Sequence, residues 1–148
     1  GTNFPILRYS DILLMHAEAS IGGRFGNRNA DAGAVSSLNK VRERAGLPPY
    51  AESLTHEDFF NELVDERLRE LCFEGLRKKD LIRWNLIKDK LDETNASITN
   101  FPSFTATNQY HQAYLTPGLT FSKARHLQLP YPLQEVSINP SLKQKPGW

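Results

Sequence analysis

Helical periodicity is the feature that most constrains the fold of this chain. After Thr55, apolar residues recur at spacings of three and four, which places them on one side of an α-helix. This stripe consists of Phe60, Leu63, Val64, Leu68 and Leu71. Thr55, with Asp58 three residues later, resembles a capping box, although Glu or Gln is the usual partner. The sequence therefore predicts a helix that begins at Thr55 and ends near a break at Gly75.

Two stretches earlier in the chain also predict helices. The first runs from about Leu7 to Ile21 and stops at Gly22-Gly23. It is apolar on more than one side, so we expect neighbours to bury it on several sides. The second runs from about Ala30 to Ala45, with Asn29 as its expected N-cap. Its apolar stripe is Ala34, Leu38, Val41 and Ala45, with Asp31 in the first turn.

A fourth helix is expected from about Leu76 to Asp92, with Leu81, Trp84, Ile87 and Leu91 along one face. The two helix pairs resemble tetratricopeptide-like helical hairpins, although their spacing is longer than that repeat's usual period. The predicted fold is mainly α, with about four helices in one domain, 1–148. Residues 7–92 form the helical part, 93–125 a long variable loop, and 126–148 an extended tail packed along the helices with one short turn.

Composition fits a folded domain and gives no direct indication of a partner. The chain has 148 residues, of which 39% are hydrophobic and 24% charged, and a net charge of +1, so nothing demands nucleic acid. A single cysteine excludes an internal disulfide, and Cys72 is expected to be a small core residue. No apolar run is long enough to span a bilayer. The chain opens at Gly1 without a Met or a signal peptide, so we expect a piece of a longer protein.

Catalysis is not indicated by any motif. The four histidines, His16, His56, His111 and His126, lack zinc-ligand spacing, and there is no phosphate-binding loop or GxSxG elbow. We therefore expect no catalytic residue, no metal and no cofactor. Glu66 and Glu70 lie one helical turn apart, so a carboxylate pair is conceivable. Neighbouring arginines would keep both ionised, which favours a structural ion network that joins the last two predicted helices.

Two groups of residues are candidates for defined roles. Arg67 lies on the apolar stripe, so we predict a structural residue with Glu70 and Asp80 as partners; Trp84, at helical spacing, is expected to pack in the core. The aromatic residues of the 93–125 loop have no periodic partner. They could stack on a sugar, dock on a protein or pack over the helices, and the candidate ligand-binding residues are Phe101, Phe104, Tyr110 and Tyr114.

Four ordered segments resemble motifs of the SusD/RagB family. They are Pro5–Ala19 (PILRYSDILLMHAEA), Leu38–Leu47 (LNKVRERAGL), Glu66–Arg77 with Asp80–Trp84 (ERLRELCFEGLR, DLIRW), and a closing pattern from Leu129 to Trp148. That pattern comprises Leu129-Pro130-Tyr131-Pro132, Glu135, Asn139-Pro140 and Gln144–Trp148. Lys78-Lys79 stand where members of the family usually show an aromatic pair. Together the motifs cover nearly the whole chain except 93–125.

The resemblance implies a non-catalytic nutrient-binding protein at the cell surface of a Bacteroidetes outer membrane. It implies a lipid anchor absent from this chain, a TonB-dependent (SusC-like) transporter as partner, and a glycan or, in some members, a peptide as ligand. The matched motifs are the family's scaffold, so no ligand residue is carried over. The alternative is a helical-repeat protein–protein interaction module with no ligand of its own. An enzyme such as a glycosidase is disfavoured because no plausible site is found.

Overall fold

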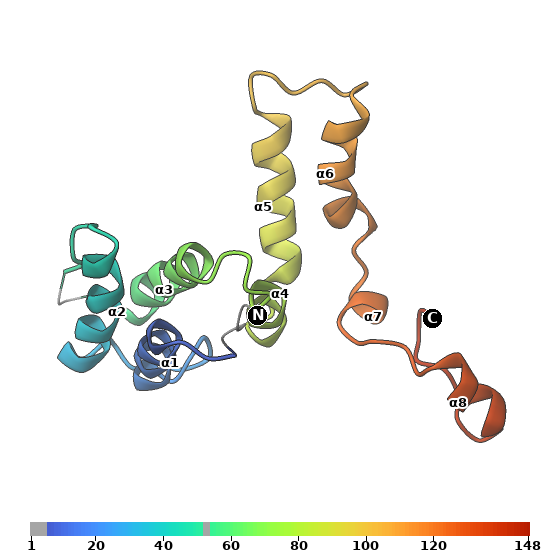
Figure 1. Cartoon of the computed structure of the whole chain (residues 1–148), viewed down its shortest axis with the longest axis horizontal. Coiled ribbons are helices and arrows are strands. Elements are labelled where there is room, and N and C mark those ends of the chain that lie inside the picture. The colour runs from blue at the N-terminus through green and yellow to red at the C-terminus, as the bar shows by residue number, and fades with distance from the viewer. Residues whose placement is uncertain (1–5, 52–53) are drawn as a thin grey trace, which may run out of the picture. The chain divides into compact units, whose positions relative to one another are not determined.

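The computed structural model describes residues 6–51 and 54–148, and in these residues it contains eight α-helices and no strand. The chain divides into two compact units, Gly1–Asp80 and Leu81–Trp148. The prediction of a mainly α fold is confirmed, but about four helices was too few. The helices (Figure 1) are α1 (Tyr9–Ile21), α2 (Ala32–Arg44), α3 (His56–Glu70), α4 (Arg77–Arg83), α5 (Ile87–Thr99), α6 (Gln109–Thr120), α7 (Lys123–His126) and α8 (Leu133–Ile138).

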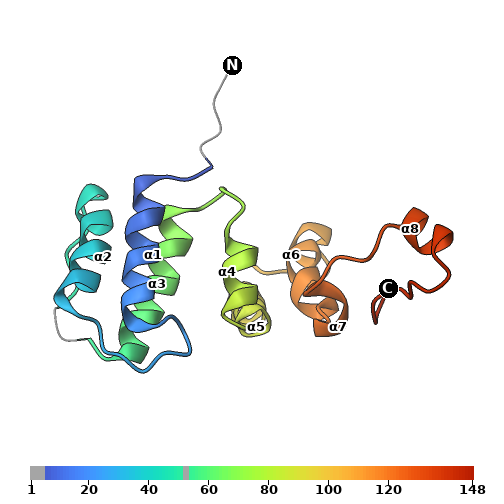
Figure 2. The same ribbon diagram turned by 90° about the horizontal axis from the view of Figure 1, so that it is seen from below.

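The core of the first unit lies between α1, α2 and α3. Helix α1 contacts both α2 and α3 and runs antiparallel to them (Figure 2). Each helix contributes apolar residues at spacings of three and four, as the sequence predicted. Full burial of one such side chain contributes about 1.5–3 kcal/mol. The largest fully buried apolar side chains here are Leu14 and Ile21 of α1, Val35, Leu38 and Val41 of α2, and Phe59, Leu63 and Val64 of α3.

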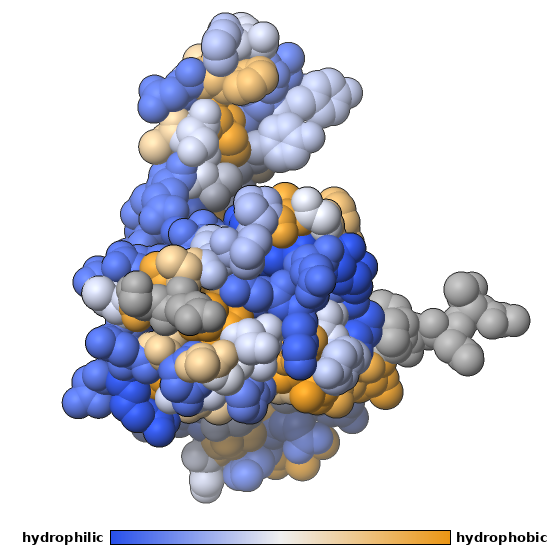
Figure 3. Space-filling view, turned by 90° about the vertical axis from the view of Figure 1, so that its left-hand side faces the viewer, coloured by the Kyte–Doolittle hydropathy of each residue, from blue (hydrophilic) through white to orange (hydrophobic). Residues whose placement is uncertain are grey.

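Some apolar residues that were expected in this core are exposed. Leu7, Ile12 and Met15 are exposed, so the prediction that α1 is buried on several sides is wrong. Within the described part of this unit, helix α1 packs against α2 and α3, and the face that carries Ile12 and Met15 is exposed. Leu68 is exposed as well, because α3 offers only part of its stripe to α1 and α2. On the face of the molecule seen in Figure 3, hydrophobic and hydrophilic residues are interspersed.

Helix boundaries follow from capping chemistry. The Thr55 hydroxyl accepts the Asp58 N–H and donates to the Asp58 carboxylate, which confirms the predicted start of α3. Helix α2 begins later than expected, because the Asp31 side chain, rather than Asn29, caps it by accepting the Ala34 N–H at 2.7 Å. The Asn29 side chain instead accepts the N–H of His56, the first residue of α3.

The predicted fourth helix, about 76–92, is two helices. Asn85 has a left-handed backbone, with φ of 53°, and separates α4 from α5. Leu86 N–H bonds to the Leu81 carbonyl and Asn85 N–H to the Ile82 carbonyl, which closes the end of α4. Asn tolerates the left-handed conformation at a helix end better than most residues do. The helical spacing of apolar residues continues through this break, so it did not predict the turn.

The predicted long loop at 93–125 is also wrong, because most of it is helical. Helix α5 continues to Thr99, and α6 packs against α5 as a hairpin (Figure 1). The Asn108 side chain caps α6 by accepting the Tyr110 N–H. Pro117 and Gly118 both lie inside this helix. Only Leu115 and Gly118 of α6 are buried, so its apolar pattern was too weak to predict.

The tail from 126 to 148 contains the short helix α8 and is otherwise irregular. This is close to the prediction of an extended tail with one short turn. It is held by contacts within the second unit. The Trp148 Nε1–H donates to the Arg125 carbonyl, and the Gln144 side chain bonds both the N–H and the carbonyl of Tyr131. No residue of the tail from 126 to 148 is buried.

Candidate functional site

Arg67 is the centre of a buried ion cluster that joins three helices of the first unit. Its Nε donates to Asp80 Oδ2 at 2.8 Å, and its Nη1 donates to Asp11 Oδ1 at 2.9 Å. The Arg67 side chain is 4% exposed, and the two carboxylates are nearly as buried. The structure contains the Asp80 partner expected for Arg67, and the structural role of Arg67 stays a prediction. Glu70 is not a partner of Arg67; Asp11 of α1 takes that place, because it faces Arg67 across the antiparallel helices.

Glu66 lies in a second cluster. Its buried carboxylate accepts from Arg42 at 3.0 Å and from Arg69 at 2.8 Å. The guanidinium of Arg42 also sits 3.8 Å from the centre of the Tyr50 ring, a cation–π contact. Burial raises the pKa of Tyr50 to about 12, and a hydrogen bond with Glu62 adds to this. With two arginines on its carboxylate, Glu66 serves as a structural anion that holds α2 to α3.

Glu70 binds different arginines, so Glu66 and Glu70 do not form a carboxylate pair. Arg8 Nη1 donates to Glu70 Oε1 at 2.9 Å, and Arg44 donates to Glu70 Oε2. Arg8 also bonds Glu74. Burial opposes the charge of Glu70, but the neighbouring Ser10 hydroxyl, Arg8 and Arg44 outweigh it and lower the pKa of this carboxyl. Glu70 therefore ties the start of α1 and the end of α2 to the end of α3.

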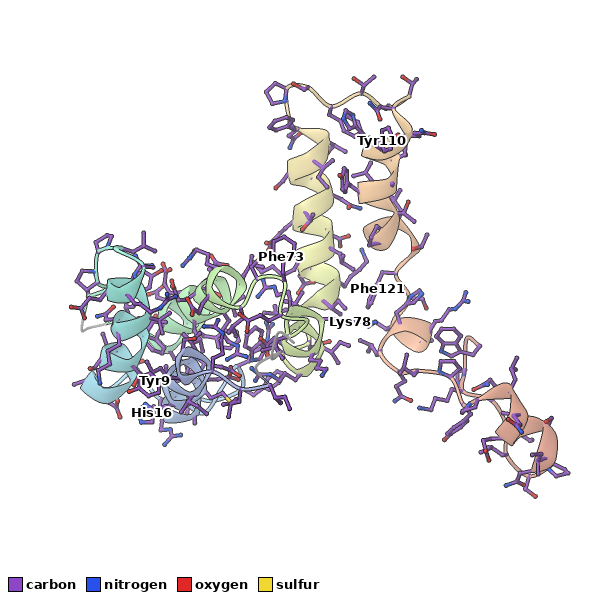
Figure 4. The ribbon with its side chains drawn as sticks, in the orientation of Figure 1. Tyr9, His16, Phe73, Lys78, Tyr110 and Phe121 are labelled. Atoms are coloured by element: carbon purple, nitrogen blue, oxygen red, sulfur yellow. The ribbon has the colours of Figure 1, made fainter. Side chains whose placement is uncertain are left out.

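Two other expectations concerned Trp84 and Cys72. Trp84 is buried, as predicted, and the Arg83 guanidinium lies 4.4 Å from its ring centre. Cys72 is exposed, so the expectation of a core cysteine is wrong. Helix α3 ends at Glu70, and Cys72 falls in the turn that follows, where helical periodicity no longer applies. Phe73, next in that turn, has φ of 64° and a fully exposed side chain (Figure 4).

The candidate aromatic residues of the second unit fall into two kinds. Tyr110 and Tyr114 are 68% and 67% exposed, and their spacing of four residues places them one turn apart on one face of α6. Figure 4 shows Tyr110. Phe101, just after α5, is exposed too. Phe104 is half-buried and stacks on His111, with 5.6 Å between ring centres. Phe104 is thus committed to packing, whereas the two tyrosines are free to meet a ligand.

Histidines in this unit have structural partners. His111 Nδ1 accepts the Thr105 N–H at 2.9 Å beneath the Phe104 ring. His126 repeats the arrangement, accepting the Ser122 N–H and stacking on Phe121. Among residues 6–51 and 54–148, no group of three His, Cys, Asp or Glu side chains is placed to hold a metal ion. Over the same residues, no helix is both long and apolar enough to cross a membrane.

Several site residues were missed from the sequence. Arg8, Arg42 and Arg44 carry the ion clusters, but their partners lie 24 to 66 residues away. Periodicity relates only residues within one helix. One signal was available for Asp11, because a carboxylate on a buried helical position requires a cation. Together, the antiparallel helices and their arginine–carboxylate clusters place this chain among the tetratricopeptide-like all-helical proteins.

The chain belongs to the SusD family, whose family model matches residues 1–148. It is 32% identical to a SusD-like protein of Formosa agariphila over 95% of this chain and 23% of that protein. It is 24% identical to the starch-binding protein SusD of Bacteroides thetaiotaomicron over 99% of this chain and 22% of that protein. A crystal structure of a SusD homolog from the same species superposes with a TM-score of 0.80 at 29% identity. That match covers 97% of this chain and 26% of the homolog, so the chain spans about a quarter of the length of these relatives.

Proposed function

We propose that this chain is part of a SusD-type protein that binds nutrient glycans at the outer cell surface without cleaving them. The observation that carries the proposal is the alignment of 99% of the chain with a protein named for starch binding. In this proposal the full-length protein is lipid-anchored in the outer membrane. It passes its ligand to a SusC-like, TonB-dependent transporter.

The carboxylates support binding rather than hydrolysis. Glycoside hydrolysis uses two carboxyl groups that flank the substrate, one of them with a raised pKa to act as the acid. Glu66 and Glu70 are each paired with arginines, and the pKa of Glu70 is lowered. With its lowered pKa, Glu70 stays ionised at neutral pH and cannot donate a proton to a leaving group.

Within the chain, we assign ligand contact to Tyr110 and Tyr114 of α6, with Phe101 of the same hairpin as a further candidate. An exposed tyrosine ring can lie against the apolar face of a sugar while its hydroxyl bonds a neighbouring group. Two rings one helical turn apart, about 5–6 Å between Cβ atoms, can engage one extended chain. Phe104 is left out of the contact, because its ring already stacks on His111.

The proposal is tested by calorimetry on the full-length protein with a panel of neutral and acidic oligosaccharides. Tyr110→Ala and Tyr114→Ala should each weaken glycan binding about fivefold, since loss of one aromatic contact costs roughly 1 kcal/mol. Phe25→Ala, which removes an equally exposed aromatic ring from the first unit, is the matched control and should change nothing. Unchanged affinity in both tyrosine variants would remove α6 from the ligand site.

The partner is tested separately by co-expressing the full-length protein with a SusC-like, TonB-dependent transporter of the same organism. Co-purification of the two, together with glycan binding by the lipoprotein, is the expected result. Transporter binding without affinity for any glycan would favour a protein–protein interaction module instead. Release of reducing ends from the glycan panel would contradict the non-catalytic part of the proposal.

A further inference from the structure

A cleft of about 390 Å³ opens between the start of α1 and the last turns of α2. Its volume falls in the range of small-ligand sites, about 300–1,000 Å³. The antiparallel arrangement creates it, because the first turn of α1 faces the C-terminal end of α2. Tyr9, the first residue of α1, contributes a ring that is 71% exposed (Figure 4). The cleft is lined by Arg8, Tyr9, Ser10, Leu13, Lys40, Val41 and Arg44.

The N-terminal end of α1 lacks a side-chain cap. Arg8 is its N-cap residue and makes no capping hydrogen bond. The first N–H groups of a helix have no partner within the helix, and the helix dipole adds partial positive charge there. Uncapped helix starts of this kind bind anions. Arg8, Tyr9 and Ser10, which form this start, all line the cleft.

Ser10 gives a second and independent indication. It is more than nine-tenths buried, and among the described residues its Oγ is the buried side-chain atom without a hydrogen-bond partner. The hydroxyl lies beside Glu70 and helps to lower the pKa of that carboxyl, but it forms no well-aligned bond. A buried polar atom without a partner destabilises the fold, because its lost bond to water is not replaced. A ligand oxygen in the cleft would remove this cost.

Three cations surround the same opening. Arg8 and Arg44 are held in place by Glu70, so their positions are fixed before any ligand arrives. Lys40 is exposed, and no carboxylate within the described residues pairs with it. Against the charges of Glu70 and Glu74, these cations leave a surplus of one positive charge around the cleft. The uncapped helix start adds to that surplus.

We propose that this cleft binds the acidic group, a carboxylate or a sulfate, of an anionic oligosaccharide. The oxyanion accepts from the Ser10 hydroxyl and the first N–H groups of α1, and Lys40 neutralises it. The ring of Tyr9 lies against the sugar that carries the group. The inference rests on the proposed glycan binding and extends it by naming an acidic class of ligand and a site apart from α6.

The test compares an acidic trisaccharide of galacturonic acid with a neutral trisaccharide of galactose, using calorimetry on the full-length protein. The acidic trisaccharide should bind more tightly, and its affinity should fall as salt is added. Ser10→Ala and Lys40→Ala should each weaken it about tenfold, the effect of one charge-assisted contact. Lys78→Ala, which removes a positive charge outside the cleft, is the matched control and should leave the affinity unchanged.

Each outcome is decisive. Equal binding of both trisaccharides, with no effect of Ser10→Ala or Lys40→Ala, overturns the anionic site while leaving the proposed glycan binding intact. Failure to bind either trisaccharide overturns the site, and failure across the wider glycan panel overturns the proposed function as well. If inorganic sulfate binds and Lys40→Ala weakens its binding, but the acidic trisaccharide does not bind, the cleft is only an ion site. That result also refutes the inference. Binding of acidic peptides in place of saccharides refutes it too.

Discussion

Substitution of Arg67 by alanine should destabilise the first unit more than any surface change. The guanidinium makes bonds of 2.8, 2.9 and 3.3 Å to two buried carboxylates. Without it, Asp11 and Asp80 lose their shared cation while remaining buried. Removal of one partner from a buried ion pair costs about 3–5 kcal/mol. For an m value of about 2 kcal/mol per molar urea, a loss of about 4 kcal/mol lowers the unfolding midpoint by about 2 M.

The assay is urea unfolding of the 148-residue chain, followed by circular dichroism at neutral pH. Lys79→Ala, an exposed cation on α4, is the control and should shift the midpoint by less than about 0.3 M, since exposed charges contribute under about 0.5 kcal/mol. A triple variant, Arg67→Met with Asp11→Asn and Asp80→Asn, should recover part of the loss, because it leaves no uncompensated charge. A midpoint unchanged in Arg67→Ala would refute the reasoning.

Three further predictions concern packing and pH. Gly118→Ala should destabilise the α5–α6 hairpin by about 1–3 kcal/mol in thermal unfolding, because the new Cβ would clash with the Asn95 side-chain nitrogen. Helix propensity alone would make this variant more stable, so a stabilised variant would contradict the clash. The pKa of Glu70 is lowered from its ordinary value of 4.5. The ion pairs of Glu70 therefore stabilise the fold fully above that pH, and this stabilisation is lost as the pH falls through the lowered pKa. The urea unfolding midpoint should therefore fall as the pH is lowered, and it should fall less steeply in Glu70→Gln than in the wild type. An equal pH dependence in the two proteins would contradict this role of Glu70. The pKa of Tyr50 is raised from 10.0 to about 12, so its contribution is complete below pH 10 and lost as pH rises through about 12. Tyr50→Phe should remove a late step from the tyrosinate absorbance titration, and a titration identical to wild type would exclude the raised value.

Local rules worked where the interacting residues are neighbours in the sequence. The Thr55 cap, the α3 stripe apart from Leu68, and the stop at Gly22 all depend on contacts within about one helical turn, and the structure has each of them. Local rules failed at Asn85 and in α6. A single left-handed residue interrupts a helix without changing the apolar spacing on either side. Helix α6 buries only Leu115 and Gly118, so its stability comes from packing on α5 rather than from a pattern of its own.

Sequence alone therefore determined the helical class, the Thr55 cap and the motifs that mark the family, and it placed Arg67 on a buried stripe. Tertiary structure decided what surrounds each charge. Glu66 and Glu70 have similar sequence surroundings, one helical turn apart on α3. The carboxylate of Glu66 nevertheless pairs with Arg42 and Arg69, whereas that of Glu70 pairs with Arg8 and Arg44. Arg69 lies on α3 with Glu66. Arg8, Arg42 and Arg44 come from the start of α1 and from α2, and only the packing of α1, α2 and α3 brings them to these carboxylates. The cleft at Ser10 has the same origin, because its two walls meet only after the helices have folded against each other.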